Sequence, residues 1–201
     1  MNNKNYKVYL AFYKAWNNDN STFQARVIGV WTNGPYSHVE LIIFDTETGK
    51  ATMCSALGTK NTVRCKRHIF NSNIYDYKEI NVKSVEHIQR FFKILEGSKY
   101  DYKGIFLSQI FPLGIDNPLE WFCSESCTKA IQLGGIDNEV IWKVKPESIS
   151  PNDLAFMLGL IKTDKKIWFI KNLNLLFKKE LSNIYVPFNV VVESDNNNLP
   201  N

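Results

Sequence analysis

The sequence lacks the features that would place a chain across a membrane or on nucleic acid. Its 201 residues contain no stretch near the roughly 20 apolar residues of a spanning helix. The N-terminus, MNNKNYKVYLAFYKAW, has no apolar core followed by a small-residue cleavage site, so we expect no signal peptide and synthesis in the cytoplasm. The formal net charge is only +4 and no long basic run is present, so we expect no nucleic-acid partner.

Cysteine and histidine are scarce. The cysteines are Cys54, Cys65, Cys123 and Cys127, and the histidines are His38, His68 and His87. In a chain without a secretion signal, so few cysteines predict reduced thiols rather than a disulfide framework. The cysteines and histidines do not form the closely spaced pairs of structural zinc sites, so we expect no metal and no other cofactor.

The composition is that of a folded globular protein, and the pattern of strands followed by helices described below predicts an α+β fold. Apolar residues make up 44% of the chain and aromatic residues 13%, which excludes a wholly disordered protein. We expect one domain over residues 1–160 and a C-terminal extension over residues 161–201 that ends in a frayed tail. Residues 165–179 are basic and aromatic, so a contact with a membrane surface is one interpretation and a cover for the core is the other.

The first 82 residues read mostly as sheet. Residues 6–13 alternate like a strand, whereas residues 25–31 fit either a strand or a short helix. YSHVELIIFD and KATMCSAL flank TETG and predict a hairpin whose turn ends in Gly49. Further strand-like material follows at residues 62–69 and 75–82.

From Ser84 onward the spacing of apolar residues becomes helical. SVEHIQRFFKILEG predicts an amphipathic helix that Gly97 stops, and another helix is expected to start within residues 100–111. A third helix is predicted from Trp121 to Leu133, and Ser150-Pro151-Asn152-Asp153 predicts the cap of a fourth.

Cys123 lies in the first turn of the helix predicted from Trp121. The unpaired N–H groups and partial positive charge at a helix N-terminus favour a thiolate, and a neighbouring histidine lowers the thiol pKa further. Cys127 lies one turn further along, where this field has faded, so we expect it to be a buried, inert thiol. The sequence therefore offers Cys123 as a candidate nucleophile.

His38 is the candidate base for this thiol. It follows a Gly-Pro turn at the start of a strand, whereas His68 and His87 are more simply read as solvated. The two-residue period of a strand places Tyr36, His38 and Glu40 on one face, so the Glu40 carboxylate is suited to orient the imidazole.

The register of the hairpin leaves the orienting group open. The second strand could instead bring Thr52, Cys54 or Ser55 to His38, and sequence does not fix that register.

These residues carry a resemblance to a known family. GPYSHVELII, MCSALGTKNTVRCK, YDYKGI, FCSESCTKAI and SPNDLAFML stand in the order seen in circularly permuted papain-like proteins, which are related to NlpC-type peptidases and lecithin retinol acyltransferase. The resemblance covers about residues 5–160. It implies an antiparallel sheet packed against the cysteine helix, with Cys123 as nucleophile and His38 as general base.

The third member of the site departs from the family pattern. Relatives often place it on the strand after the histidine strand, where this chain has Cys54 and Ser55 and no carboxylate or second histidine. We therefore prefer Glu40 as the third member and keep Ser55 as the alternative.

The resemblance implies a cysteine hydrolase that cleaves an amide or peptide bond, with a cell-wall peptide from peptidoglycan as the expected substrate. Transfer of a lipid acyl group is the neighbouring enzymatic alternative. A non-enzymatic structural protein, with virion proteins as partners, is the alternative from another class. The incomplete match at the third position and the long C-terminal extension favour this alternative.

Overall fold

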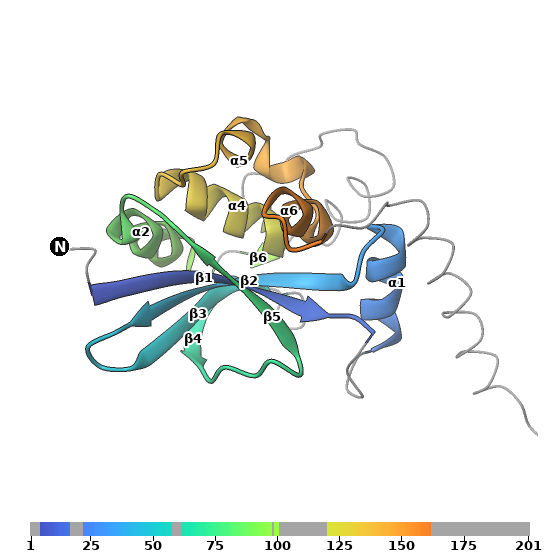
Figure 1. The fold of residues 1–201 in the computed structure, drawn as a ribbon, viewed down its shortest axis with the longest axis horizontal. Helices are drawn as coiled ribbons and strands as arrows, with labels where there is room; N and C mark the ends of the chain where they lie inside the picture. The colour runs from blue at the N-terminus through green and yellow to red at the C-terminus, as the bar shows by residue number, and fades with distance from the viewer. Residues whose placement is uncertain (1–4, 17–21, 58–61, 98, 101–119, 162–201) are drawn as a thin grey trace, which may run out of the picture.

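The computed structural model is an α+β structure in which helices lie against one sheet (Figure 1). It describes residues 5–16, 22–57, 62–97, 99–100 and 120–161. The predicted extension at residues 161–201 lies, from residue 162 onward, outside the described residues. Residues 101–119, within which most of the helix expected from residues 100–111 falls, also lie outside them.

Within the described residues the sheet has seven strands, in the order β5-β1-β2-β3-β4-β6-β7. The strands are β1 (Tyr6–Lys14), β2 (Tyr36–Asp45), β3 (Lys50–Leu57), β4 (Thr62–His68), β5 (Tyr75–Ile80), β6 (Lys99–Tyr100) and β7 (Glu120–Trp121). Neighbouring strands are antiparallel, except that β6 and β7 are parallel. The β2–β3 hairpin confirms the sequence prediction, since Asp45 pairs with Lys50 and Gly49 has the positive φ of 66° that its turn requires.

Six helical segments belong to the described residues. They are α1 (Phe23–Trp31), α2 (Val85–Leu95), α4 (Cys123–Leu133), α5 (Glu139–Lys143), the 3₁₀ segment η3 (Pro146–Ser148) and α6 (Pro151–Met157). The ambiguous residues 25–31 are therefore helical, because the Thr22 side chain accepts a hydrogen bond from the Ala25 N–H and caps the first turn. The predicted caps at Ser84 and Ser150 are both present.

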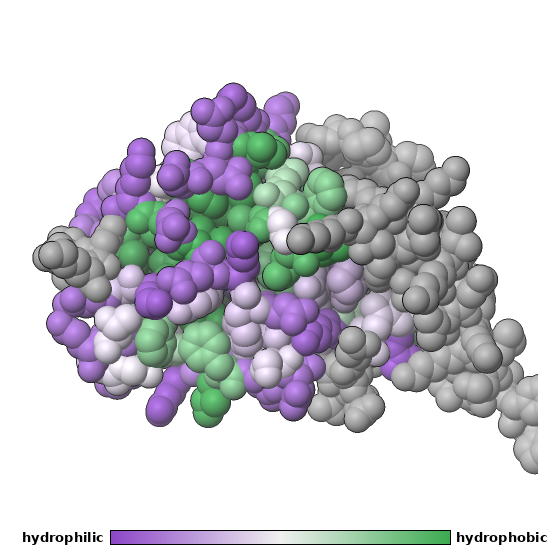
Figure 2. Space-filling view, in the orientation of Figure 1, coloured by the Kyte–Doolittle hydropathy of each residue, from purple (hydrophilic) through white to green (hydrophobic). Residues whose placement is uncertain are grey.

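The main core lies between the helices and one face of the sheet. Figure 1 shows α2, α4, α5 and α6 on one side of the strands, and Figure 2 shows hydrophobic residues gathered between these two layers. Leu10, Leu41, Phe92 and Ile131 are among the fully buried side chains of this core. Burying each such side chain contributes about 1.5 to 3 kcal/mol, which fixes α4 against β2 and β3.

The opposite face of the sheet carries an aromatic cluster. Ala11, Ile42, Ala51 and Met53 are buried there, beneath partly buried aromatic side chains. These are Tyr9, Phe44, Tyr75 and Tyr77. We call this side of the sheet the outer face, in contrast to the face that the helices cover.

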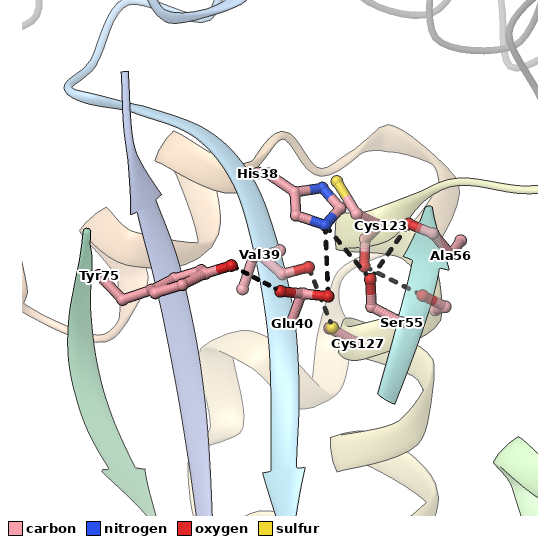
Figure 3. Close-up of polar contacts among 9 residues, drawn as sticks. His38, Val39, Glu40, Ser55, Ala56, Tyr75, Cys123 and Cys127 are labelled. Carbon is pink, nitrogen blue, oxygen red and sulfur yellow. Dashed lines mark hydrogen bonds and ion pairs between the residues drawn. The ribbon is translucent and has the colours of Figure 1, made fainter. Parts of the chain in front are cut away.

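The β2–β3 ladder ends before either strand does. Pairing runs from Asp45 and Lys50 to Leu41 and Cys54, and no pair is present beyond that point among the described residues. Residues 36–40 of β2 pair with β1, while residues 55–57 of β3 pair with β4. The two strand ends therefore separate, and the N-terminus of α4 lies beside them (Figure 3).

Two of the four cysteines form a disulfide, so the prediction of four reduced thiols is wrong for this pair. Cys54 of β3 lies directly opposite Cys65 of β4, with a Cα–Cα distance of 4.1 Å, and their sulfurs are bonded. Strand register made this pair, and the spacing of the two residues alone did not reveal it. Cys123 and Cys127 remain free thiols.

No helix within the described part of the chain is long and apolar enough to cross a membrane.

Candidate active site

A β-bulge places the histidine at the start of β2. His38 pairs with Tyr13 of β1, but the next pair joins Lys14 to Tyr36, so Ser37 is an extra residue in the ladder. Because of this extra residue, Tyr36 joins the buried core with Val39. The prediction that Tyr36 shares a face with His38 and Glu40 is therefore wrong, while His38 and Glu40 keep their common face.

The N-terminus of α4 supplies the cysteine. The helix begins at Cys123, two residues later than its predicted start at Trp121, and Phe122 is the N-cap residue. The Glu125 carboxylate accepts a hydrogen bond from the Phe122 N–H at 3.3 Å, which fixes the first turn. The first intrahelical bond runs from the Ser126 N–H to the Phe122 carbonyl, so the N–H groups of residues 123–125 precede the helical ladder.

Cys123 and His38 lie together between the separated ends of β2 and β3. Figure 3 shows the Cys123 sulfur beside the His38 ring, on the side of Nδ1. The two side chains lie side by side, and the charge of each acts on the other. Cys123 is 4% exposed, so this thiol is buried in contact with its candidate base.

The electrostatics of the pair favour a thiolate and an imidazolium. Burial alone would raise the pKa of the Cys123 thiol, but the charge of the neighbouring His38 lowers it below the ordinary value. Burial would likewise lower the pKa of His38, but Cys123 and Glu40 raise it from 6.5 to about 10. Each partner therefore stabilises the charged form of the other at neutral pH.

Glu40 and Ser55 both face the other ring nitrogen of His38. The Nε2 atom lies 3.8 Å from Glu40 Oε1 and 3.4 Å from Ser55 Oγ. The Ser55 hydroxyl donates its proton to the Ala56 carbonyl at 3.1 Å, so its oxygen is left to accept from Nε2–H. With Nε2 protonated toward these oxygens, Nδ1 faces the thiol.

Tyr75 holds the Glu40 carboxylate from β5. Its hydroxyl donates to Glu40 Oε2 at 3.0 Å, and Glu40 itself is 4% exposed. Burial would raise the pKa of Glu40, but the hydrogen bond and charge of His38, the charge of Lys66 and the Tyr75 hydroxyl lower it. A carboxylate with these partners stays ionised although it is buried.

Asn152 of α6 fixes the backbone just before His38. Its Oδ1 accepts from the Tyr36 N–H at 3.0 Å, and its Nδ2 donates to the Tyr36 carbonyl at 2.7 Å and to Thr32 Oγ1 at 2.6 Å. A Cβ at Gly34 would overlap this side-chain amide, so the turn before β2 requires glycine there. We call this arrangement the Asn152 clamp.

Sequence reasoning did not select Tyr75 or Asn152 as site residues. Tyr75 comes from a strand that pairs with β1 and has no direct ladder with β2. The sequence places Asn152 only in a helix cap, and the burial of its polar side chain, which marks it as a site residue, is visible only in the structure.

The remaining cysteine and histidines lie apart from this chemistry. Cys127 is fully buried, its Sγ donates to the Val39 carbonyl at 3.7 Å, and burial raises its thiol pKa well above the ordinary value. His87 is exposed on α2 as expected. His68 is not simply solvated: it is half-buried in the aromatic cluster and its Nε2 lies 3.1 Å from the Tyr77 hydroxyl, and burial lowers its pKa.

Among the described residues, no group of three or more His, Cys, Asp or Glu side chains is placed to hold a metal ion.

Comparison of the chain with protein-family models, with curated proteins and with solved structures finds no match.

Proposed function

We propose that this protein is a cysteine hydrolase that cleaves an amide or peptide bond through a thioester intermediate. The observation that carries the proposal is the position of the Cys123 sulfur, in the first turn of α4, beside the ring of His38, whose other ring nitrogen faces Glu40 and Ser55. A nucleophile, a base and an orienting group in this relation are the requirements of thiol acyl-transfer chemistry.

The proposed fold is a circularly permuted papain-like one. The antiparallel sheet, the cysteine helix packed against β2 and β3, and the order of His38 before Cys123 support it. This assignment rests on the order and packing of the elements together with the sequence resemblance.

In the first step the Cys123 thiolate attacks the carbonyl carbon of the substrate and a C–S bond forms. The carbonyl π electrons move to oxygen and then return as the C–N bond breaks. The leaving amine takes the proton that the His38 imidazolium carries on Nδ1. The products of this step are a thioester on Cys123, a free amine and a neutral imidazole.

In the second step His38 accepts a proton from water while the water oxygen attacks the thioester carbon. The C–S bond breaks, a carboxylic acid leaves, and Cys123 returns as a thiolate beside the imidazolium. The Glu40 carboxylate and the Ser55 hydroxyl hold the ring in the orientation that both transfers need.

The oxyanion of each tetrahedral intermediate requires hydrogen-bond donors. The backbone N–H of Cys123 precedes the intrahelical ladder of α4 and lies at the positive end of the helix dipole. We assign it as a donor in this role, so that no further side chain is needed.

The proposed substrate is an amide or peptide, with a cell-wall peptide from peptidoglycan preferred. This preference comes from the sequence resemblance alone. A lipid acyl donor is the second substrate to test, because the same thioester chemistry transfers acyl groups.

The test is the alkylation rate of Cys123 by iodoacetamide at neutral pH, followed by assays on peptidoglycan fragments and on acyl lipids. We expect Cys123 to react about tenfold faster than an unfolded peptide cysteine, since such a cysteine is only a few per cent thiolate at pH 7. His38→Ala should abolish this advantage, and the exposed His87→Ala is the matched control.

Product formation that Cys123→Ala abolishes would establish the activity. A thiol that reacts no faster than a peptide cysteine, with no product from either substrate, would contradict the proposal. That result would favour the structural alternative, in which the fold binds other proteins without turnover.

A further inference from the structure

Strand β4 carries two cations beside the candidate active site. Arg64 lies directly opposite Ser55 of β3, and Lys66 lies opposite Met53. Residues directly opposite on antiparallel strands share a face, so both side chains are on the outer face with Ser55, whose Oγ lies 3.4 Å from His38 Nε2. We call Arg64 and Lys66 the β4 cation pair.

Both cations are accessible. Arg64 is partly exposed and Lys66 is exposed. Neither has an ion-pair partner within 4.0 Å among the residues that the structure describes. The disulfide between Cys54 and Cys65 lies between these two pairs of residues and fixes the register that sets Arg64 against Ser55.

The other charges on this face leave the region next to the site positive. Lys7 and Glu79 pair with each other at 3.3 Å on β1 and β5. Glu40 and the Cys123 thiolate are negative and His38 is positive, so the site has one net negative charge against the two positive charges of the β4 cation pair. Burial lowers the pKa of His68, which is therefore neutral at neutral pH. The charge of Lys66 contributes to the low pKa of Glu40, so the field of this strand reaches the site.

Strand spacing sets the reach of the β4 cation pair. Ser55 Oγ lies 3.4 Å from His38 Nε2, and Ser55 pairs with Arg64 on β4, where neighbouring strands lie about 4.8 Å apart. An extended peptide advances about 3.3 Å per residue. An anionic group two or three residues from the scissile bond would therefore lie within reach of Arg64 and Lys66.

We propose that the β4 cation pair is an anion subsite, and that the preferred substrate carries a carboxylate on the side of the scissile bond that faces β4. The proposal names the substrate class of the hydrolase site and rests on the proposed function. An acidic peptide or an acyl group that bears a carboxylate fits this subsite, and a neutral acyl chain does not gain from it.

The first experiment measures the field at Cys123 without any substrate. Alkylation of Cys123 is followed in the full chain with iodoacetate, which is anionic, and with iodoacetamide, which is neutral. The ratio of the two rates reports the potential at the thiol and cancels its intrinsic reactivity. Arg64→Gln and Lys66→Gln should each lower this ratio about twofold to fivefold, the range that one partly exposed ion pair provides.

Arg67→Gln is the matched control. Arg67 is an exposed cation of the same strand, but it lies opposite Thr52 on the other face of the sheet. It should leave the ratio unchanged, and the effect of Arg64→Gln should shrink with added salt because exposed charges are screened over about 8 Å at physiological ionic strength. An unchanged ratio in both Arg64→Gln and Lys66→Gln overturns the proposal.

The second experiment uses two p-nitrophenyl esters, one of glutaric acid with a free carboxylate and one of butyric acid. The full chain should prefer the glutarate ester in kcat/KM, and Arg64→Gln should reduce this preference about twofold to fivefold while Arg67→Gln keeps it. If the ratio of kcat/KM for the two esters is the same in the native chain, Arg64→Gln and Arg67→Gln, the subsite proposal is overturned.

The two proposals fail in different ways. If Cys123 is alkylated no faster than a peptide cysteine and the chain hydrolyses neither ester, the hydrolase proposal is contradicted. The ratio of the two alkylation rates still tests the β4 cation pair. Hydrolysis of both esters with no carboxylate preference contradicts the subsite and leaves the hydrolase standing.

Discussion

Asn152 and Tyr36 are 116 residues apart in the chain, yet the side-chain amide of Asn152 pairs with both backbone groups of Tyr36. The amide acts like a neighbouring strand at the start of β2, where residues 36–40 have no β3 partner. Because His38 follows two residues later, the Asn152 clamp fixes the backbone from which the imidazole projects.

Loss of the Asn152 clamp should destabilise the fold and shift the candidate site. Asn152→Ala leaves the buried N–H and carbonyl of Tyr36 unpaired, which costs about 1 to 3 kcal/mol per group. Urea unfolding measures this loss, and the alkylation rate of Cys123 in the folded variant should fall because His38 is less well placed. A variant as stable and as reactive as the native chain would show that the clamp is dispensable.

A double-mutant cycle with Gly34 isolates the contact. Gly34→Ala should destabilise the native chain, because the added methyl group would overlap the Asn152 amide. The same change should cost less in the Asn152→Ala background, with a coupling energy of about 1 kcal/mol or more. Additive changes in the free energy of unfolding would mean that residues 34 and 152 are not in contact. Gly49→Ala, whose strain comes from a positive φ of 66°, is a control without this coupling.

The rate of Cys123 alkylation should depend on pH in two steps. Because the pKa of Cys123 is lowered, the rate should rise at a pH below that of an ordinary thiol and then reach a plateau. The His38 pKa of about 10 sets the upper end of the plateau, since the imidazolium loses its proton there. Stopped-flow or quenched alkylation measures both limbs of the rate profile. A range of about pH 4 to pH 11 covers the values at which thiols and imidazoles titrate in proteins.

In His38→Ala the lower limb should move up toward the ordinary thiol range, because the cation that lowers the pKa of Cys123 is gone. A single limb at the ordinary position in the native chain would contradict the ion pair.

The pH dependence of Cys123 alkylation also distinguishes whether Glu40 or Ser55 orients His38. Glu40→Gln removes the carboxylate charge that helps to raise the pKa of His38, so the upper limb should move from about 10 to lower pH. Ser55→Ala removes only a neutral acceptor and should move that limb less. The reverse order would identify Ser55 as the orienting residue. Tyr75→Phe, which leaves Glu40 in place but removes its hydrogen bond, should give a smaller shift than Glu40→Gln.

The disulfide predicts a definite thiol count. Denatured under non-reducing conditions, the chain should show two free thiols, from Cys123 and Cys127, and four after reduction. Because the bond closes a loop with a sequence separation of 11, reduction should lower the free energy of unfolding by about 3 kcal/mol. Cys54→Ser with Cys65→Ser should reproduce this loss, and four thiols before reduction would contradict the pairing.

Local patterns were enough to predict most of the elements near the site. The hairpin around residues 46–49, the α2 helix with its Ser84 cap and the α6 helix with its Ser150 cap all follow from turn chemistry, period and capping residues. Residues 25–31 stayed ambiguous because an apolar run of that length fits both a strand and a helix, and the cap at Thr22 decided it.

The sequence by itself determined which groups carry chemistry: a cysteine in the first turn of a helix, a histidine after a turn and a glutamate two residues along the same strand. Only the tertiary structure decided which of them meet. The bulge at Ser37 places Tyr36 in the core. The register of β3 places Ser55 beside His38 and Cys54 opposite Cys65. Tyr75 and Asn152 reached the site from distant segments. The physical reason is that register and packing are set by pairing and burial over the whole sheet, and a short stretch of sequence does not contain that information.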